Sequence, residues 1–123
     1  RYEECVKQIH QIEPTSLFVC VDSIVVRRKI WNNLPRSIQF FCDGRMAAES
    51  FSIYAWVKGA NCNYKESFFT AAKAYPAPCT AKSTYYCANI CAGFMVAQFA
   101  KYIRGFQVDS QVSFNILAME RII

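Results

Sequence analysis

The stretch that most constrains the fold covers residues 17–49, because short apolar runs there alternate with a helical pattern. Residues 17–21 have the length and the β-branched content of a fully buried strand. Ser23 is a good helix N-cap, and the helix that follows it must end before Pro35. A second apolar run covers residues 37–42. This order predicts a strand, a helix and a second strand that pairs in parallel with the first.

Acidic residues follow both predicted strands. Asp22 comes after the first run, and Asp43, followed by Gly44 and Arg45, comes after the second. In open α/β sheets, ligands bind outside the carboxyl ends of parallel strands, so we expect the functional site there. A carboxylate at such a strand end suits Mg²⁺ held between protein and phosphates, whereas a helix-capping aspartate is the alternative for Asp22. Arg45 could clamp a carboxylate or a phosphate, or be a plain surface arginine.

The rest of the chain predicts further helices and strands. Residues 1–14 have one apolar helical face, and residues 50–57 alternate as in a half-buried strand near a sheet edge. A short helix is expected within residues 64–74. A long helix, apolar nearly all round, is expected at 82–104, and a last strand at 112–119. Together these elements predict an α/β fold.

Composition favours a globular domain and restricts its partners. The chain has 123 residues, of which 54% are hydrophobic, enough for one domain with a core. The net charge is +5, but the bases cluster only at residues 27–29, without interleaved aromatics, so we expect no nucleic acid partner. Residues 83–100 are uncharged, yet Thr84, Asn89 and Gln98 favour a core helix over a membrane span, and we expect no membrane partner.

The seven cysteines lack the regular spacing of a disulfide framework, which indicates a reducing, cytoplasmic setting. No CxxC pair occurs and there is one histidine, so a zinc site is not expected. Cys20 and Cys42 fall in the predicted buried strands. Cys87 and Cys91 share one face of a helix, where core packing is favoured over metal binding.

Cys79 stands apart from the other cysteines. It follows the extended run Tyr75-Pro76-Ala77-Pro78 and precedes the long predicted helix. The helix N-terminus and Lys82 would favour its thiolate form, as nucleophilic chemistry requires. An exposed loop cysteine without chemistry is the alternative.

The sequence contains the runs FVCVDSIVVRR, FFCDGRMAAES and PCTAKSTYYCANICAGFMVAQFAKYI. Together they resemble the ThiF/MoeB/HesA family, the bacterial relatives of ubiquitin-activating E1 enzymes. The resemblance implies a Rossmann-like, mostly parallel sheet flanked by helices, which binds ATP and Mg²⁺. It also implies adenylation of the C-terminal carboxylate of a ubiquitin-like or sulfur-carrier protein, by a homodimer or heterodimer.

The resemblance also assigns roles to individual residues. Asp22 matches the family acid that handles Mg²⁺ and the triphosphate, so it is the candidate metal ligand and a candidate catalytic residue. Ser23, Arg27 and Arg1 join it as cofactor-binding candidates, with Arg1 at the place of a phosphate-contacting lysine. Cys79 matches the crossover-loop cysteine that takes the acyl group or sulfur, and is the second catalytic candidate.

The first part of the family pattern is not matched. The glycine-rich GxGxxG turn is absent, and Glu13 stands at the place of the family's asparagine. We therefore expect residues 1–123 to form a single domain, the second part of the nucleotide-binding domain, as a fragment or as ordered pieces of a longer chain. A non-catalytic E1-like subunit that scaffolds a ubiquitin-like partner is the alternative function. The segment around Cys79 argues against a third option, a dinucleotide-binding oxidoreductase.

Overall fold

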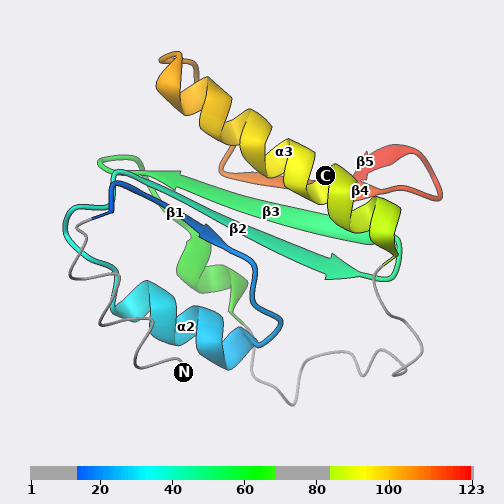
Figure 1. The fold of residues 1–123 in the computed structure, drawn as a ribbon, viewed down its shortest axis with the longest axis horizontal. Coiled ribbons are helices and arrows are strands. Elements are labelled where there is room, and N and C mark those ends of the chain that lie inside the picture. The colour runs from blue at the N-terminus through cyan, green and yellow to red at the C-terminus, as the bar shows by residue number, and fades with distance from the viewer. Residues whose placement is uncertain (1–13, 69–83, 123) are drawn as a thin grey trace.

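The computed structural model describes residues 14–68 and 84–122, and they form one mixed sheet with a helix against each face (Figure 1). The strands lie in the sheet in chain order: β1 (Ser16–Val19), β2 (Phe40–Ala47), β3 (Ser50–Val57), β4 (Gln111–Asn115) and β5 (Glu120–Ile122). Strands β1 and β2 are parallel, and the other pairings are antiparallel. The α/β class is confirmed, but the prediction of a mostly parallel sheet is wrong. The short turns after β2 and β4 can join only antiparallel neighbours.

The predicted strand–helix–strand unit is present in β1, α2 (Ile24–Asn32) and β2. The Ser23 hydroxyl caps α2 by accepting a hydrogen bond from the Val26 amide at 3.4 Å. The helix ends before Pro35, as predicted. Strand β1 ends at Val19, earlier than expected, and β2 continues well past Cys42 to Ala47.

Strand β3 lies at the centre of the sheet, between β2 and β4. Its predicted alternation is confirmed, because Phe51, Ile53 and Ala55 are buried. The predicted position near an edge is wrong, since the long-range pairing with β4 covers its second edge. The single strand predicted at 112–119 is wrong as well. A turn in which Met119 has a φ of 53° separates β4 from β5.

The short helix predicted in residues 64–74 is observed as a 3₁₀ helix at Tyr64–Ser67, and residues 69–74 lie outside the described part. Helix α3 (Tyr85–Ile103) confirms the long predicted helix. The Thr84 hydroxyl caps it by accepting a hydrogen bond from the Cys87 amide at 3.4 Å. Gly105, with a φ of +74°, follows its last turn. No helix of the described residues has the length and apolarity needed to cross a membrane.

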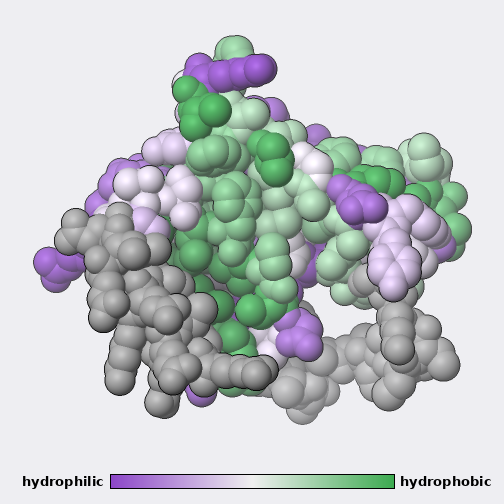
Figure 2. All heavy atoms as spheres, viewed as in Figure 1, coloured by the Kyte–Doolittle hydropathy of each residue, from purple (hydrophilic) through white to green (hydrophobic). Residues whose placement is uncertain are grey.

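The two helices create two separate cores, one on each face of the sheet. The α3 side buries eight residues: Phe40, Cys42, Phe51, Ile53, Ala55, Cys87, Cys91 and Met95. The α2 side buries Val19, Ile38, Phe41 and Tyr64. Helix α3 also exposes apolar side chains, with Ile90 and Phe94 on one flank and Val96 and Ile103 on its outer side, and Figure 2 shows apolar side chains gathered over this helix.

Candidate functional site

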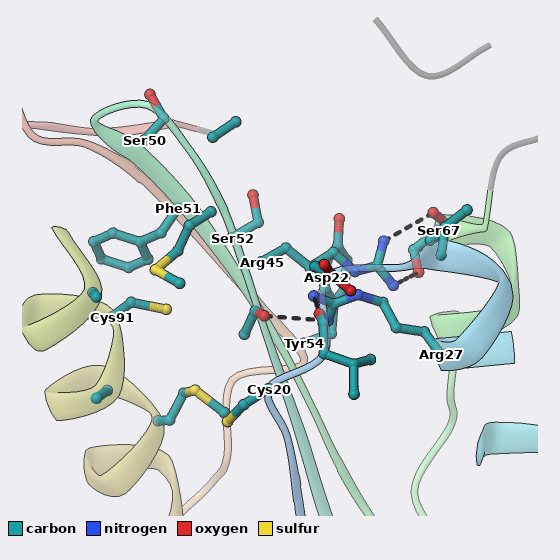
Figure 3. A pocket seen from close by; sticks show the side chains of 18 of the residues that line it. Cys20, Asp22, Arg27, Arg45, Ser50, Phe51, Ser52, Tyr54, Ser67 and Cys91 are labelled. Carbon is teal, nitrogen blue, oxygen red and sulfur yellow. Dashed lines mark hydrogen bonds between the residues drawn. The ribbon is translucent and has the colours of Figure 1, made fainter. Parts of the chain in front are cut away.

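A cleft of about 610 Å³ opens between the β1–α2 connection, the β2–β3 hairpin and helix α3. Its two walls differ in chemistry, as Figure 3 shows. Charged and hydroxyl side chains form one wall: Asp22, Arg27, Arg45, Ser52, Tyr54 and Ser67. Sulfur-containing and apolar side chains form the other: Cys20, Met46, Phe51, Ala88, Cys91 and Met95. The cleft therefore extends around the free edge of β2, with its polar lining on the α2 side of the sheet and its apolar lining on the α3 side.

A buried carboxylate, that of Asp43, organises the polar wall. Arg27 Nη1 forms an ion pair with Asp43 Oδ1, and Arg45 Nε donates to Asp43 Oδ2 at 2.8 Å. The Tyr64 hydroxyl donates to the same Oδ2 at 2.8 Å. Burial raises the pKa of Tyr64, so that hydroxyl stays protonated and able to donate. Asp43 is thus fully partnered although its side chain is inaccessible to solvent.

The Arg27 side chain projects from α2 and contacts both the β1–α2 connection and strand β2. Besides its ion pair with Asp43, it donates to the carbonyl of Val21 and, at 3.2 Å, to the carbonyl of Gly44. Burial lowers the pKa of Arg27, and the nearby Arg45 cation lowers it further. The resemblance assigned Arg27 to the cofactor. The structure places its guanidinium in this buried network, at the floor of the cleft.

Arg45 is held from both ends of its guanidinium. On the side away from Asp43, Nη1 donates to the Ser67 carbonyl at 3.0 Å and Nη2 to the Ser67 hydroxyl at 2.9 Å. Its Cζ lies 4.3 Å from the ring centroid of Tyr54 and 5.3 Å from that of Tyr64. The sequence left open whether Arg45 binds a ligand or is a plain surface arginine. Its contact with Asp43 could have been predicted, because residues two apart in a strand lie on the same face.

Asp22 is exposed, follows β1 by three residues and lines the mouth of the cleft. No hydrogen bond or ion pair with another described residue engages its carboxylate. Ser23 beside it is occupied as the cap of α2. The expectation that Asp43 ends a strand as Asp22 does is wrong, because Asp43 lies within β2, paired with Val19. Arg1 and Cys79 fall outside the described residues.

The thiols near the cleft divide into exposed and buried groups. Cys20 was predicted in a buried strand, but it follows β1 and is exposed. The predicted core packing of Cys87 and Cys91 is confirmed, and Cys42 is also buried. Burial raises the pKa of Cys42 to about 12 and that of Cys91 to about 11. These buried thiols are therefore unreactive at neutral pH.

Within residues 14–68 and 84–122, no group of three histidine, cysteine or acidic side chains is arranged to hold a metal ion. A metal at this cleft would have Asp22 as its protein ligand and would need the remaining ligands from a bound anion and water. Comparison of the chain with models of known families gives no match, and neither does comparison with curated proteins.

Proposed function

We propose that this domain is part of an E1-like adenylyltransferase that activates the C-terminal carboxylate of a ubiquitin-like or sulfur-carrier protein with ATP. The observation that carries the proposal is the position of Asp22. Its exposed carboxylate follows the first strand of the parallel pair and lines a cleft with two guanidinium groups at its floor. The carboxyl ends of parallel strands are where open α/β sheets bind ligands.

The cleft residues offer one ligand for the magnesium ion of MgATP, but not a binding site for the whole nucleotide. Mg²⁺ commonly binds proteins through one or two carboxylates and takes its other ligands from phosphate and water. Asp22 supplies one carboxylate, while that of Asp43 is used by Arg27, Arg45 and Tyr64. The sequence contains no glycine-rich GxGxxG turn to cradle the phosphates. When bound, MgATP would supply the α-phosphate that the partner's carboxylate attacks, with transfer of the adenylyl group to the carboxylate and release of pyrophosphate.

The residues of this chain then act by positioning and by charge. Asp22 would hold the metal, and Ser23 fixes the start of α2 so that Asp22 stays at the strand end. Arg27 and Arg45 give the floor of the cleft a positive potential. By resemblance, Cys79 would take the activated acyl group or sulfur after adenylation.

A non-catalytic E1-like subunit, a scaffold for a ubiquitin-like protein or for a second subunit, is the alternative. The apolar side chains that α3 exposes, above all Val96 and Ile103, favour it. Exposed apolar surface of this kind often marks a protein interface.

ATP–pyrophosphate exchange by the full-length protein, with a ubiquitin-like protein ending in Gly-Gly, distinguishes the two functions. An adenylyltransferase catalyses this exchange, and a non-catalytic scaffold does not. Asp22→Asn should lower exchange by about a hundredfold or more, because the metal ligand is lost. Glu120→Gln removes another exposed carboxylate, from β5, and should leave exchange unchanged. Calorimetry of magnesium-dependent ATP binding gives a readout that does not require the partner. A folded Asp22→Asn protein with full exchange would refute the assignment.

The role of Cys79 is tested by Cys79→Ser in the same protein. We expect this variant to retain exchange but to lose any thiol-sensitive conjugate with the partner, because the serine hydroxyl is a far weaker nucleophile. Persistence of that conjugate would remove Cys79 from the mechanism and leave the adenylation proposal standing on Asp22.

A further inference from the structure

The polar floor of the cleft carries more positive than negative charge. Arg27 and Arg45 both contact the one carboxylate of Asp43, and their side chains are only 7% and 16% exposed. Among the described residues, no second carboxylate forms an ion pair with either guanidinium. Asp22 is exposed and acts on Arg27 only through a weak charge interaction. Among the described residues, the two guanidinium groups thus share one ion-paired carboxylate, and an anion in the cleft would neutralise the excess positive charge.

The neighbours of Arg45 pre-organise its guanidinium for binding such an anion. The bonds to Asp43 and Ser67 fix the orientation of the guanidinium plane, and the Tyr54 ring lies against it. Each terminal nitrogen uses one N–H in these bonds, so one N–H on each has no acceptor among the described residues. A guanidinium fixed in this way loses little entropy when it binds an oxyanion.

We infer that Arg45 is an oxyanion-binding residue of the cleft, held in place by Asp43 and by Ser67. The ligand group is a phosphoryl or a carboxylate oxyanion, which share the geometry that a guanidinium recognises. The choice of anions to test, magnesium pyrophosphate and a C-terminal glycine carboxylate, rests on the proposed function. The expectation that Arg45 binds an oxyanion rests on the positive charge of the cleft.

The test measures binding by the full-length protein without any turnover. Calorimetry uses three probes: pyrophosphate with Mg²⁺, acetyl-Gly-Gly, and the amide of acetyl-Gly-Gly. Binding of the first identifies a phosphoryl ligand. Binding of the peptide acid but not of its amide identifies a carboxylate. Failure of both anions to bind the unmodified protein would overturn the inference.

Substitutions then locate the bound anion. Arg45→Gln leaves Asp43 paired with Arg27 and Tyr64, so it should fold, and its affinity for the bound anion should fall about tenfold or more. Arg45→Lys keeps the charge but loses the fork, and should also bind more weakly. Arg104→Gln makes the same charge change at the exposed end of α3 and should bind normally. Equal affinity of the Arg45→Gln and Arg104→Gln proteins would overturn the inference.

A purely structural role for Arg45 makes a different prediction. If Arg45 were purely structural, its variants would have a lower melting temperature, but the NMR signal of Arg45 would not change when an anion is added. Side-chain ¹⁵N NMR of the unmodified protein reads that signal directly. Titration with the bound anion should shift the Arg45 Nε resonance, and an unshifted resonance at saturation would reject the inference. Loss of ATP–pyrophosphate exchange with intact anion binding would reject only the adenylation proposal.

Discussion

The Tyr64 hydroxyl donates to Asp43 Oδ2, the same oxygen that accepts a hydrogen bond from Arg45 Nε. This links the 3₁₀ helix at Tyr64–Ser67 to the buried part of β2, on the side of the sheet that α2 covers. Three donors thus converge on a carboxylate that has no contact with solvent. The stability of this part of the molecule depends on keeping those donors together.

Tyr64→Phe should lower the free energy of unfolding by about 1–2 kcal/mol, because it removes one hydrogen bond to a buried charge and keeps the ring. Urea denaturation measures the loss. Tyr85→Phe is the matched control, since Tyr85 is 93% exposed, and it should change stability by less than about 0.5 kcal/mol. Equal effects of the two substitutions would show that the Tyr64 bond contributes nothing.

Asp43→Asn should be far more damaging, with a loss of about 3–5 kcal/mol, because the buried guanidinium of Arg27 and the half-buried guanidinium of Arg45 then face no carboxylate. Adding Arg45→Gln should recover part of that loss, since it removes one of the two stranded charges. A double mutant cycle by urea denaturation checks this. Strictly additive losses would mean that Asp43 and Arg45 act independently.

Gly44→Ala should destabilise the domain by about 1–3 kcal/mol. A Cβ at this position would lie 2.5 Å from Met95 Sδ and 3.2 Å from Cys91 Sγ, so the buried Met95 side chain would have to move. Combined with Met95→Ala, the substitution should cost less than the sum of the two. Gly93→Ala is the control, because nothing surrounds that helical glycine, and it should stabilise α3 by up to about 1 kcal/mol.

Asp109 predicts a pH dependence of stability. The hydrogen bonds from Lys101 at 2.5 Å and from Gln98 at 3.1 Å hold the pKa of Asp109 below its ordinary value of 3.8. Its stabilising contribution is therefore complete above the ordinary pKa and is lost as the pH falls through the lower folded-state pKa. The melting temperatures of the wild-type and Asp109→Asn proteins should differ by a constant amount from pH 7 to about pH 5, and the difference should shrink as the pH falls below about pH 4. A difference that stays the same throughout the acid range would contradict this.

The cysteines of the cleft should differ in reactivity. Iodoacetamide at pH 8 should alkylate the exposed Cys20 while Cys42 and Cys91 stay unmodified, because burial keeps both as thiols. Peptide mass spectrometry after timed quenching measures the rates. In urea all three should react at similar rates. Modification of Cys42 in the native protein would show that α3 opens from the sheet.

The strand–helix–strand unit was predictable because its signals are local. The Ser23 cap, the stop at Pro35 and the apolar runs each act within a few residues. The same holds for the alternation of β3. The central position of β3 was not predictable, since it depends on β4, which follows much later in the chain. A local pattern reports which face is buried, not which strand lies alongside.

The candidate site was predictable only in part. The strand-end position of Asp22 followed from the apolar run before it, and the structure places Asp22 at the cleft. Asp43 was expected to end a strand because an acid in an apolar run is a common stop signal. It lies within β2 because Arg45 of the same strand, Arg27 of α2 and Tyr64 of the 3₁₀ helix supply its partners. No periodicity of one segment reports such an arrangement.

The place of β3 in the sheet has a consequence for synthesis of the chain. Its partner on one side is β2, which is already made when β3 leaves the ribosome, but β4 on the other side is made only after α3. Until then the nascent chain has an unpaired strand edge next to the buried side chains Phe51 and Ile53. Translation that pauses within α3 would prolong this state, in which the chain is most exposed to aggregation and to chaperones.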